Sequence, residues 1–345
     1  MTNQHEITKR MPLLNREGNL TEPGWARGLL WDYHRPDIRA SGMRIKEWDY
    51  YFVSNGHIGL ALTIADNGYM GLDSVSYLDF DEKWEITKSP MRLLPMGKTA
   101  LPETSAAGSS EIARGGYALA FYHDDDGTRK LTFHMDKFRG KDAIEGMISL
   151  SDEPAESMVI ATPFEKSGHF YYNQKINCMR AAGWIELGGA RVELDPKTWF
   201  AVLDWGRGVW TYHNTWYWGS ASGEVDGVPF GWNIGYGFGD TSAASENVLF
   251  YGGKIHKLSQ VRFEIPMQDG EENYLAPWRF SSDDGRFEMA FAPILNRAAY
   301  TSLGVIKSDQ NQVFGRFTGT AALDDGTVLQ VNDFFGFAEK VENKW

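Results

Sequence analysis

Short, largely hydrophobic runs that resemble β-strands, separated by turn dipeptides, dominate the chain. Runs at 50–53, 58–64, 118–122 and 131–135 have the composition of β-strands and lie beside such dipeptides. The dipeptides tolerate the positive φ angles that two-residue hairpin turns require. They include Asn55-Gly56, Asn67-Gly68, Asp126-Gly127, Gly188-Gly189, Asp226-Gly227, Gly252-Gly253, Asp284-Gly285 and Asp325-Gly326. The pattern predicts antiparallel strands joined by hairpins.

Helical periodicity is weak throughout the chain. Residues 98–115 are small and polar and are predicted to form a loop, and residues 241–247 to form at most a turn or two. The strand-like runs number about 15 to 18, whereas one small barrel closes with roughly 8 strands. We therefore predict an all-β fold of two antiparallel β-barrel domains packed together. The boundary is placed near Val225, with an N-terminal domain and its extensions over residues 1–225 and a C-terminal domain over 226–345.

Composition supports this fold class and narrows the choice of partners. The 345 residues include 37 Gly, 13 Trp, 15 Tyr and 20 Phe, which is typical of β proteins with many tight turns. The formal net charge is −12, so repulsion from phosphate disfavours nucleic acid and anionic membrane surfaces as partners. We expect a small apolar molecule as the partner, and we leave open a homodimer.

The sequence offers little for metals, disulfides or membranes. Cys178 is the single cysteine, and the eight histidines are scattered without ligand spacing, so we expect no metal and no cofactor. The N-terminal residues lack the apolar core of a secretory signal. No run reaches the roughly 18 apolar residues of a membrane span. We therefore expect a cytoplasmic protein without stable membrane insertion.

Aromatic and polar residues are most concentrated in 204–223, which holds four of the 13 tryptophans. If this segment is extended, both of its faces mix rings with polar groups. Such a mixture suits the wall of a ligand cavity, where rings supply contact area and polar groups fix orientation. It equally suits a packed core with an Asp204–Arg207 ion pair. The candidate ligand-binding residues here are Arg207, Trp210, Asn214, Trp216 and Trp218.

Glycine alternates with bulky residues in the following segment, 230–247. Its glycines would line one side of a strand together with Asn233. A glycine row permits either sharp bending of the strand or close approach of another group, and we favour bending. Trp232, Asn233 and Glu246 complete the candidate ligand-binding residues.

Acid–base chemistry is the best-supported catalytic hypothesis. A carboxyl or imidazole among aromatic strands is desolvated, and desolvation raises the pKa of a carboxyl and lowers that of a histidine. Asp204 and Asp240 are the candidate proton donors. His213 and Tyr236 are the candidates for positioning the acid or recapturing the proton.

Several motifs resemble those of the Domain of Unknown Function 2804 family, over nearly the whole chain after an N-terminal extension. They are Trp48-Asp49-Tyr50-Tyr51, Thr63-Ile64-Ala65-Asp66, Asp204-Trp205-Gly206-Arg207-Gly208, Asn214-Thr215-Trp216-Tyr217-Trp218-Gly219, Gly231-Trp232-Asn233 and Phe335-Gly336-Phe337-Ala338-Glu339. More distantly, the chain is similar to the carotenoid hydratase, tocopherol cyclase and lipocalin-like pericyclase groups. That resemblance implies two lipocalin-like (calycin-type) barrels that bind apolar ligands.

The distant resemblance also implies site residues. The positions most like the hydratase arrangement are Asp204, His213, Trp216, Trp232 and Asp240. Asn233 stands where those groups often carry an acid after Gly-Trp. Because of this difference, the hydratase mechanism does not transfer unchanged to this chain.

Three functions fit these observations. The preferred one is a cofactor-independent lyase or isomerase that protonates, hydrates, isomerises or cyclises a hydrophobic or terpenoid-like small molecule in an aromatic-lined cavity. The second is a non-catalytic lipid or isoprenoid carrier that uses the same barrel. The third is a carbohydrate-active or carbohydrate-binding protein, since aromatic platforms with carboxylates also suit sugars.

Overall fold

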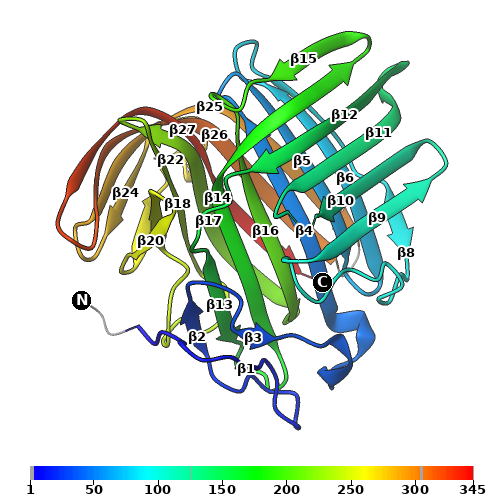
Figure 1. Ribbon diagram of the computed structural model, residues 1–345, viewed down its shortest axis with the longest axis vertical. Coiled ribbons are helices and arrows are strands. Elements are labelled where there is room, and N and C mark those ends of the chain that lie inside the picture. The colour runs from blue at the N-terminus through cyan, green and yellow to red at the C-terminus, as the bar shows by residue number, and fades with distance from the viewer. Residues whose placement is uncertain (1–3, 125, 304–305, 345) are drawn as a thin grey trace.

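The computed structural model describes residues 4–124, 126–303 and 306–344. Within these residues it contains 27 strands and two short 3₁₀ helices, η1 (Arg35–Asp37) and η2 (Gly42–Arg44). Most strands belong to two large antiparallel sheets, which lie side by side in Figure 1. The predicted all-β fold is confirmed.

The first sheet has 14 strands and curls around a core of aliphatic and aromatic side chains, among them Leu62, Ile148 and Leu203. Its main path runs β7-β6-β5-β4-β16-β14-β12-β11-β10-β9. These are β7 (Trp84–Lys88), β6 (Met70–Asp79), β5 (Ile58–Asp66), β4 (Ile45–Ser54), β16 (Phe200–Val209), β14 (Phe170–Leu187), β12 (Asp142–Ser151), β11 (Arg129–Arg139), β10 (Tyr117–His123) and β9 (Gly108–Arg114). Four strands pair beside this path: β2 (Gly24–Ala26), β8 (Met91–Leu93), β13 (Met158–Pro163) and β15 (Ala190–Leu194).

The second sheet has nine strands and surrounds a more aromatic core, which includes Trp232, Phe287 and Phe317. In sheet order they are β20 (Lys254–Lys257), β19 (Val248–Tyr251), β18 (Val228–Tyr236), β17 (His213–Val225), β27 (Val328–Lys344), β26 (Ile306–Ala322), β25 (Phe287–Leu303), β24 (Trp278–Ser282) and β21 (Val261–Glu264). Two small pairs complete the fold: β1 (Met11–Pro12) with β3 (Trp31–Asp32), and β22 (Met267–Gln268) with β23 (Glu271–Glu272).

The outer faces of the two sheets pack against each other. Strands β4 and β16 of the first sheet contribute Phe52 and Val202, and β17 and β27 of the second contribute Trp218 and Phe337, to one buried cluster. The chain passes from the first sheet to the second between β16 and β17. The boundary predicted near Val225 therefore falls at the end of β17, one strand after the change of sheet.

The turn predictions are confirmed, and one loop prediction is wrong. Every turn dipeptide named above connects two successive antiparallel strands, as Asn55-Gly56 does between β4 and β5. Residues 108–114 are predicted to lie in a loop but form strand β9. Their small polar residues show no strand pattern, and pairing with β10 supplies the backbone hydrogen bonds that order them. Strands of two to five residues raise the total above the predicted number.

Candidate functional site

Four charged side chains meet where the two sheets pack together, and we name Lys175, Asp204, Glu246 and Glu339 the interdomain charge cluster. The Lys175 Nζ atom lies 2.9 Å from Asp204 Oδ1 and 4.0 Å from Glu246 Oε2. The side chains of Lys175, Asp204 and Glu246 are only 4%, 12% and 13% exposed. One cation thus contacts two carboxyl groups in a nearly dry environment, and Glu339 lies nearby.

The strand registers bring this cluster together. In the first sheet, Lys175 of β14 lies directly opposite Asp204 of β16. In the second sheet, Glu339 of β27 lies opposite Trp218 of β17. Glu246 lies in the irregular segment between β18 and β19. Because the period of a strand is two residues, each of the strand residues points from its sheet into the interface.

Glu339 differs from the other carboxyl groups because neutral side chains hold it. Its Oε1 accepts a hydrogen bond of 2.8 Å from the Trp216 indole, and its Oε2 one of 3.0 Å from the Gln312 amide. Burial raises the pKa of Glu339 from its ordinary value to about 7, although the Trp216 hydrogen bond and the charges of Arg297 and Lys175 act in the opposite direction. Glu339 can therefore carry a proton at neutral pH.

Asp204 and Glu246 receive more support for a negative charge. Asp204 Oδ1 accepts a hydrogen bond of 2.6 Å from Asn173 in addition to its contact with Lys175. Asn233 donates a longer bond of 3.3 Å to Glu246 Oε2. Burial raises the pKa of Glu246, and the Lys175 charge opposes that shift. The cluster thus combines one carboxyl without a cation in contact and two beside Lys175.

Aromatic rings enclose the cluster. Lys175 Nζ lies 4.0 Å from the centre of the Trp218 ring, and the Trp218 indole donates a 2.6 Å hydrogen bond to Asn233. Gly206 makes room for Trp48, since a Cβ atom there would lie 1.9 Å from that indole. A Cβ atom on Gly235 would lie 2.6 Å from Glu246 Oε1. At Gly235, therefore, the glycine row permits close approach, which was not the interpretation we favoured from the sequence.

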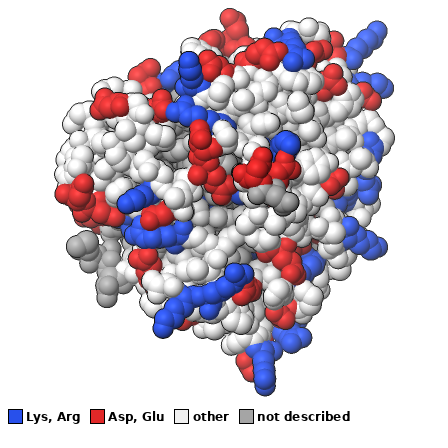
Figure 2. All heavy atoms as spheres, in the orientation of Figure 1, with Lys and Arg blue, Asp and Glu red and all other residues white. Residues whose placement is uncertain are grey.

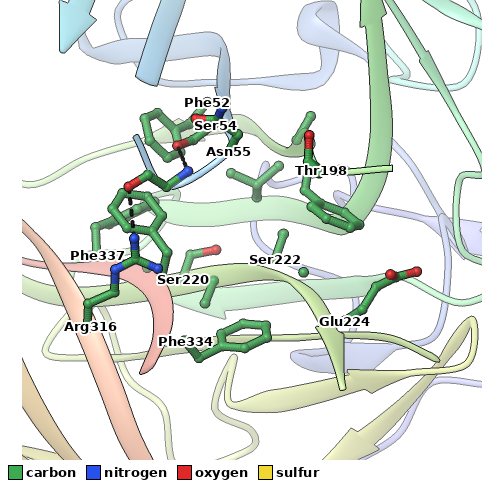
Figure 3. A pocket seen from close by; sticks show the side chains of 18 of the residues that line it. Phe52, Ser54, Asn55, Thr198, Ser220, Ser222, Glu224, Arg316, Phe334 and Phe337 are labelled. Atoms are coloured by element: carbon green, nitrogen blue, oxygen red, sulfur yellow. Dashed lines mark hydrogen bonds between the residues drawn. The ribbon is translucent and has the colours of Figure 1, made fainter. Parts of the chain in front are cut away.

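A cavity of about 280 Å³ lies between the sheets, and we name it the interdomain cavity (Figure 3). Its wall includes Phe52 of β4, Val202 of β16, Ser220 of β17 and Phe337 of β27. Val202, Ser220 and Phe337 are each two positions along their strand from a residue in or beside the charge cluster, namely Asp204, Trp218 and Glu339. Cavity and charge cluster are therefore neighbours on one interface, about 7 Å apart along each strand.

The structure places some predicted site residues in this region. Asp204 and Glu246 belong to the charge cluster, and Asn233, Trp216 and Trp218 hydrogen-bond within or beside it. None of the twelve predicted site residues lines the interdomain cavity.

Two predicted residues point into the second sheet's interior. Trp232 is fully buried in that aromatic core. Tyr236 stacks on Tyr217 with ring centres 4.4 Å apart, and burial raises its pKa to about 12. These orientations follow from strand β18, in which Asn233 faces the first sheet and its neighbours face the other way.

Arg207 and Asp204 do not form the ion pair considered above, because they lie on opposite faces of β16. Arg207 instead pairs inside the first domain with Asp49, at 3.0 Å between Nη1 and Oδ1. Asp204 pairs with Lys175 across the interface side of the same sheet. Side chains three positions apart on a strand point to opposite faces, so Asp204 and Arg207 have different partners.

The remaining predicted residues lie away from the cluster's charged groups. His213 and Asp240 are exposed, and Asp240 accepts a turn hydrogen bond from the Ser242 backbone. That bond lowers the pKa of Asp240. Asn214 bonds to Thr211. Trp210 packs edge-on against Trp48 and Phe238. No observation of the structure assigns these residues a role in proton transfer.

Sequence reasoning missed Lys175 and Glu339. A signal for Lys175 existed: Asn173, Lys175 and Asn177 occupy every second position of β14 and so place a row of polar side chains on one face of a buried strand, which is unusual. Glu339 ends the motif Phe335-Gly336-Phe337-Ala338-Glu339, which contributed to the family resemblance but to none of the site predictions.

The described part of the chain offers no arrangement for a metal ion, since no three of its His, Cys, Asp or Glu side chains group together as ligands would. No helix among those residues is long and apolar enough to span a membrane. On the face shown in Figure 2, acidic and basic side chains are interspersed.

The family can now be assigned from a match that extends over residues 4–345. The chain belongs to the family described as a domain of unknown function, DUF2804. The predicted family resemblance is thus confirmed. No curated protein matches the sequence.

Solved structures with a similar fold include a candidate AttH protein of Nitrosomonas europaea. It is 13% identical, with a TM-score of 0.55, and the match covers 89% of this chain and 96% of that one. Kievitone hydratase of Nectria haematococca also matches, at 8% identity and a TM-score of 0.49, over 97% of this chain and 98% of that one. At these identities the AttH likeness establishes the shared fold alone, and the second likeness carries no argument.

Proposed function

We propose that this protein is a cofactor-independent acid–base enzyme of the hydratase, isomerase or cyclase type that acts on a hydrophobic small molecule. The observation that carries the proposal is the pair of environments within the charge cluster. Glu339 is buried among neutral donors with a pKa of about 7, whereas Asp204 contacts Lys175 at 2.9 Å. Carboxyl groups whose environments separate their pKa values can divide the roles of acid and base.

The chemistry follows from these roles. Protonated Glu339 gives its proton to one carbon of a substrate double bond, whose π electrons form the new C–H bond and leave a cation on the neighbouring carbon. Ring faces of the aromatic side chains around the cluster stabilise the cation. Water then adds to it and loses a proton to Asp204, which gives an alcohol. Loss of a proton from an adjacent carbon gives an isomer instead.

Proton transfer of this kind draws only on protein groups and water. Solvent restores the proton on Glu339 and removes the one on Asp204, so the cycle returns the enzyme to its starting state. Lys175 acts as a positioning residue, because its ammonium group contacts the carboxyl groups of both Asp204 and Glu246.

The two other functions considered from the sequence have less support. A carrier needs apolar walls, but it gains nothing from one buried lysine among three carboxyl groups, an arrangement that costs stability. A carbohydrate enzyme needs two carboxyl groups on either side of the scissile bond, whereas Asp204 and Glu246 both contact Lys175. We therefore retain the acid–base enzyme.

An isotope screen tests this function and finds the substrate in the same experiment. The protein is incubated with extracts of apolar metabolites in D₂O or in H₂¹⁸O, and enzyme-dependent mass changes are recorded. Hydration introduces the oxygen isotope, and isomerisation or cyclisation introduces deuterium. We expect at least one product that Glu339→Gln forms about 10²- to 10⁴-fold more slowly, the typical contribution of a general acid.

The control is Glu342→Gln on the same strand, whose side chain is 41% exposed and bonds only Lys340 among the described residues. It should retain the parental rate. The proposal is wrong if no isotope enters any compound, or if folded Glu339→Gln and Asp204→Asn proteins both form the products at that rate.

A further inference from the structure

We infer that the interdomain cavity is a binding site for a compact aromatic molecule that carries one anionic group. This site lies beside the charge cluster, and its occupancy requires no proton transfer. The inference rests on the cavity's walls and on Arg316, neither of which the proposed chemistry uses.

The walls of the cavity fit a flat, apolar ring system. Five phenylalanines line it, one from β4, one from β16 and three from β27: Phe52, Phe200, Phe334, Phe335 and Phe337. A volume of about 280 Å³ is near the lower end of the range for small-molecule sites. Phenylalanine edges and faces favour aromatic guests through offset and edge-on contacts.

Arg316 supplies a positive group at one end of this wall. The side chain is 27% exposed, and its guanidinium donates to the backbone carbonyls of Gly56 and Asp333. A guanidinium has five N–H donors, so these two bonds leave capacity for an anion. The carboxylate of Asp333, 3.9 Å away and 80% exposed, makes a weak, screened pair with it.

The negative groups around the cavity do not cancel this preference. Glu224 lines the cavity, but Arg180 already pairs with it, and Figure 3 shows it at the opposite end from Arg316. Ser54 and Asn55 lie near the Arg316 end (Figure 3). Asn55 uses its side-chain oxygen for backbone N–H groups, so its amide can donate to a ligand.

Two fluorescent probes test the inference, because they share one ring system and differ in charge. 1-Anilinonaphthalene-8-sulfonate carries a sulfonate, and N-phenyl-1-naphthylamine does not. We expect one sulfonate probe to bind per chain, more tightly than the neutral probe. Arg316→Gln should weaken the sulfonate probe at least tenfold and leave the neutral probe within about twofold.

Two further variants complete the test. Arg279→Gln, on the exposed side of β24, serves as a matched loss of positive charge and should change neither affinity. Thr198→Trp adds a ring at the exposed rim of the cavity and should weaken both probes at least tenfold. Thermal melts verify folding, and Arg316→Lys, which keeps the charge, should retain most of the sulfonate affinity if Arg316→Gln unfolds.

The inference is overturned if the parental protein binds no sulfonate probe, binds it without saturation, or binds it equally well after Thr198→Trp or Arg316→Gln. It is also overturned if both probes bind with the same affinity. None of these results depends on Glu339, so the inference and the proposed function fail separately.

Discussion

Strand β16 separates two buried charge networks that differ in their ratio of cations to carboxyl groups. On its interface side, the interdomain charge cluster sets one lysine against three carboxyl groups. On its other side, Arg207 and Arg35 face Asp49 and Glu47, so cations and carboxylates are equal in number. We name this second group the balanced network.

The two networks differ in how far neighbouring cations oppose the effect of burial on a carboxyl group. Burial also raises the pKa of Glu47, but the two arginines of the balanced network oppose that shift. Glu339 has no such contact, since both of its oxygens accept hydrogen bonds from neutral groups. Two arginines contact Glu47 and oppose the effect of burial there, whereas no cation in the described part of the chain contacts Glu339, and burial raises its pKa to about 7.

The largest expected effect comes from breaking the balanced network. Arg207→Met leaves Asp49 and Glu47 buried without their shared cation, and we expect a loss of about 3–5 kcal/mol in the free energy of unfolding. Denaturant unfolding at neutral pH measures it. A change below about 1 kcal/mol would contradict the structural role of this network.

The next effect sharpens the comparison through pH. Glu339 has a pKa of about 7 in the folded state and an ordinary value of 4.5 when unfolded, so the folded state holds more of this proton between pH 4.5 and 7. Stability from this group is therefore full below pH 4.5 and is lost as the pH rises to 7, by roughly 3 kcal/mol. Glu339→Gln should remove that loss.

Unfolding of the parental protein and of Glu339→Gln at pH 5 and pH 8 gives the measurement. We expect the variant to be the more stable of the two at pH 8 and to lose that advantage at pH 5. An identical pH dependence for both proteins would show that Glu339 is ionised normally.

A smaller effect should follow from filling the space beneath Trp48. In Gly206→Ala the added methyl group would lie 1.9 Å from the Trp48 indole, so the ring must move, at a cost of about 1–3 kcal/mol. Gly28→Ala is the matched control, because a Cβ atom there meets nothing within 4 Å. Equal stability of the two variants would contradict the close packing described for Gly206.

The smallest effect is expected at two residues proposed from the sequence. His213 and Asp240 are exposed, so His213→Gln and Asp240→Asn should each change the free energy of unfolding by less than about 0.5 kcal/mol. Once the isotope screen has found a substrate, both should also keep the parental rate. A large loss of rate in either variant would contradict the proposed site and would indicate a catalytic site nearer the surface.

Local signals in the sequence were sufficient for the fold class and the hairpins. A dipeptide such as Asn55-Gly56 determines its own turn through backbone sterics, so its neighbours in space matter little. Strand β9 was missed because its residues, 108–114, are ordered by pairing with β10 and carry no pattern of their own.

The site was only partly predictable, since it depends on contacts between distant strands. Asp204 and Glu246 were found because they lie within aromatic segments. Lys175 meets Asp204 through the pairing of β14 with β16, and Glu339 of β27 joins them only after the two sheets pack. The spacing of residues along the sequence does not predict such contacts between distant strands.

The protonation state of Glu339 tests the central claim most directly. Infrared difference spectra between the parental protein and Glu339→Gln isolate the C=O stretch of one protonated carboxyl, and a pH titration follows its disappearance. The account predicts that this band persists at pH 6 and titrates with a midpoint at a pKa of about 7. A carboxyl already ionised at pH 5 would contradict it.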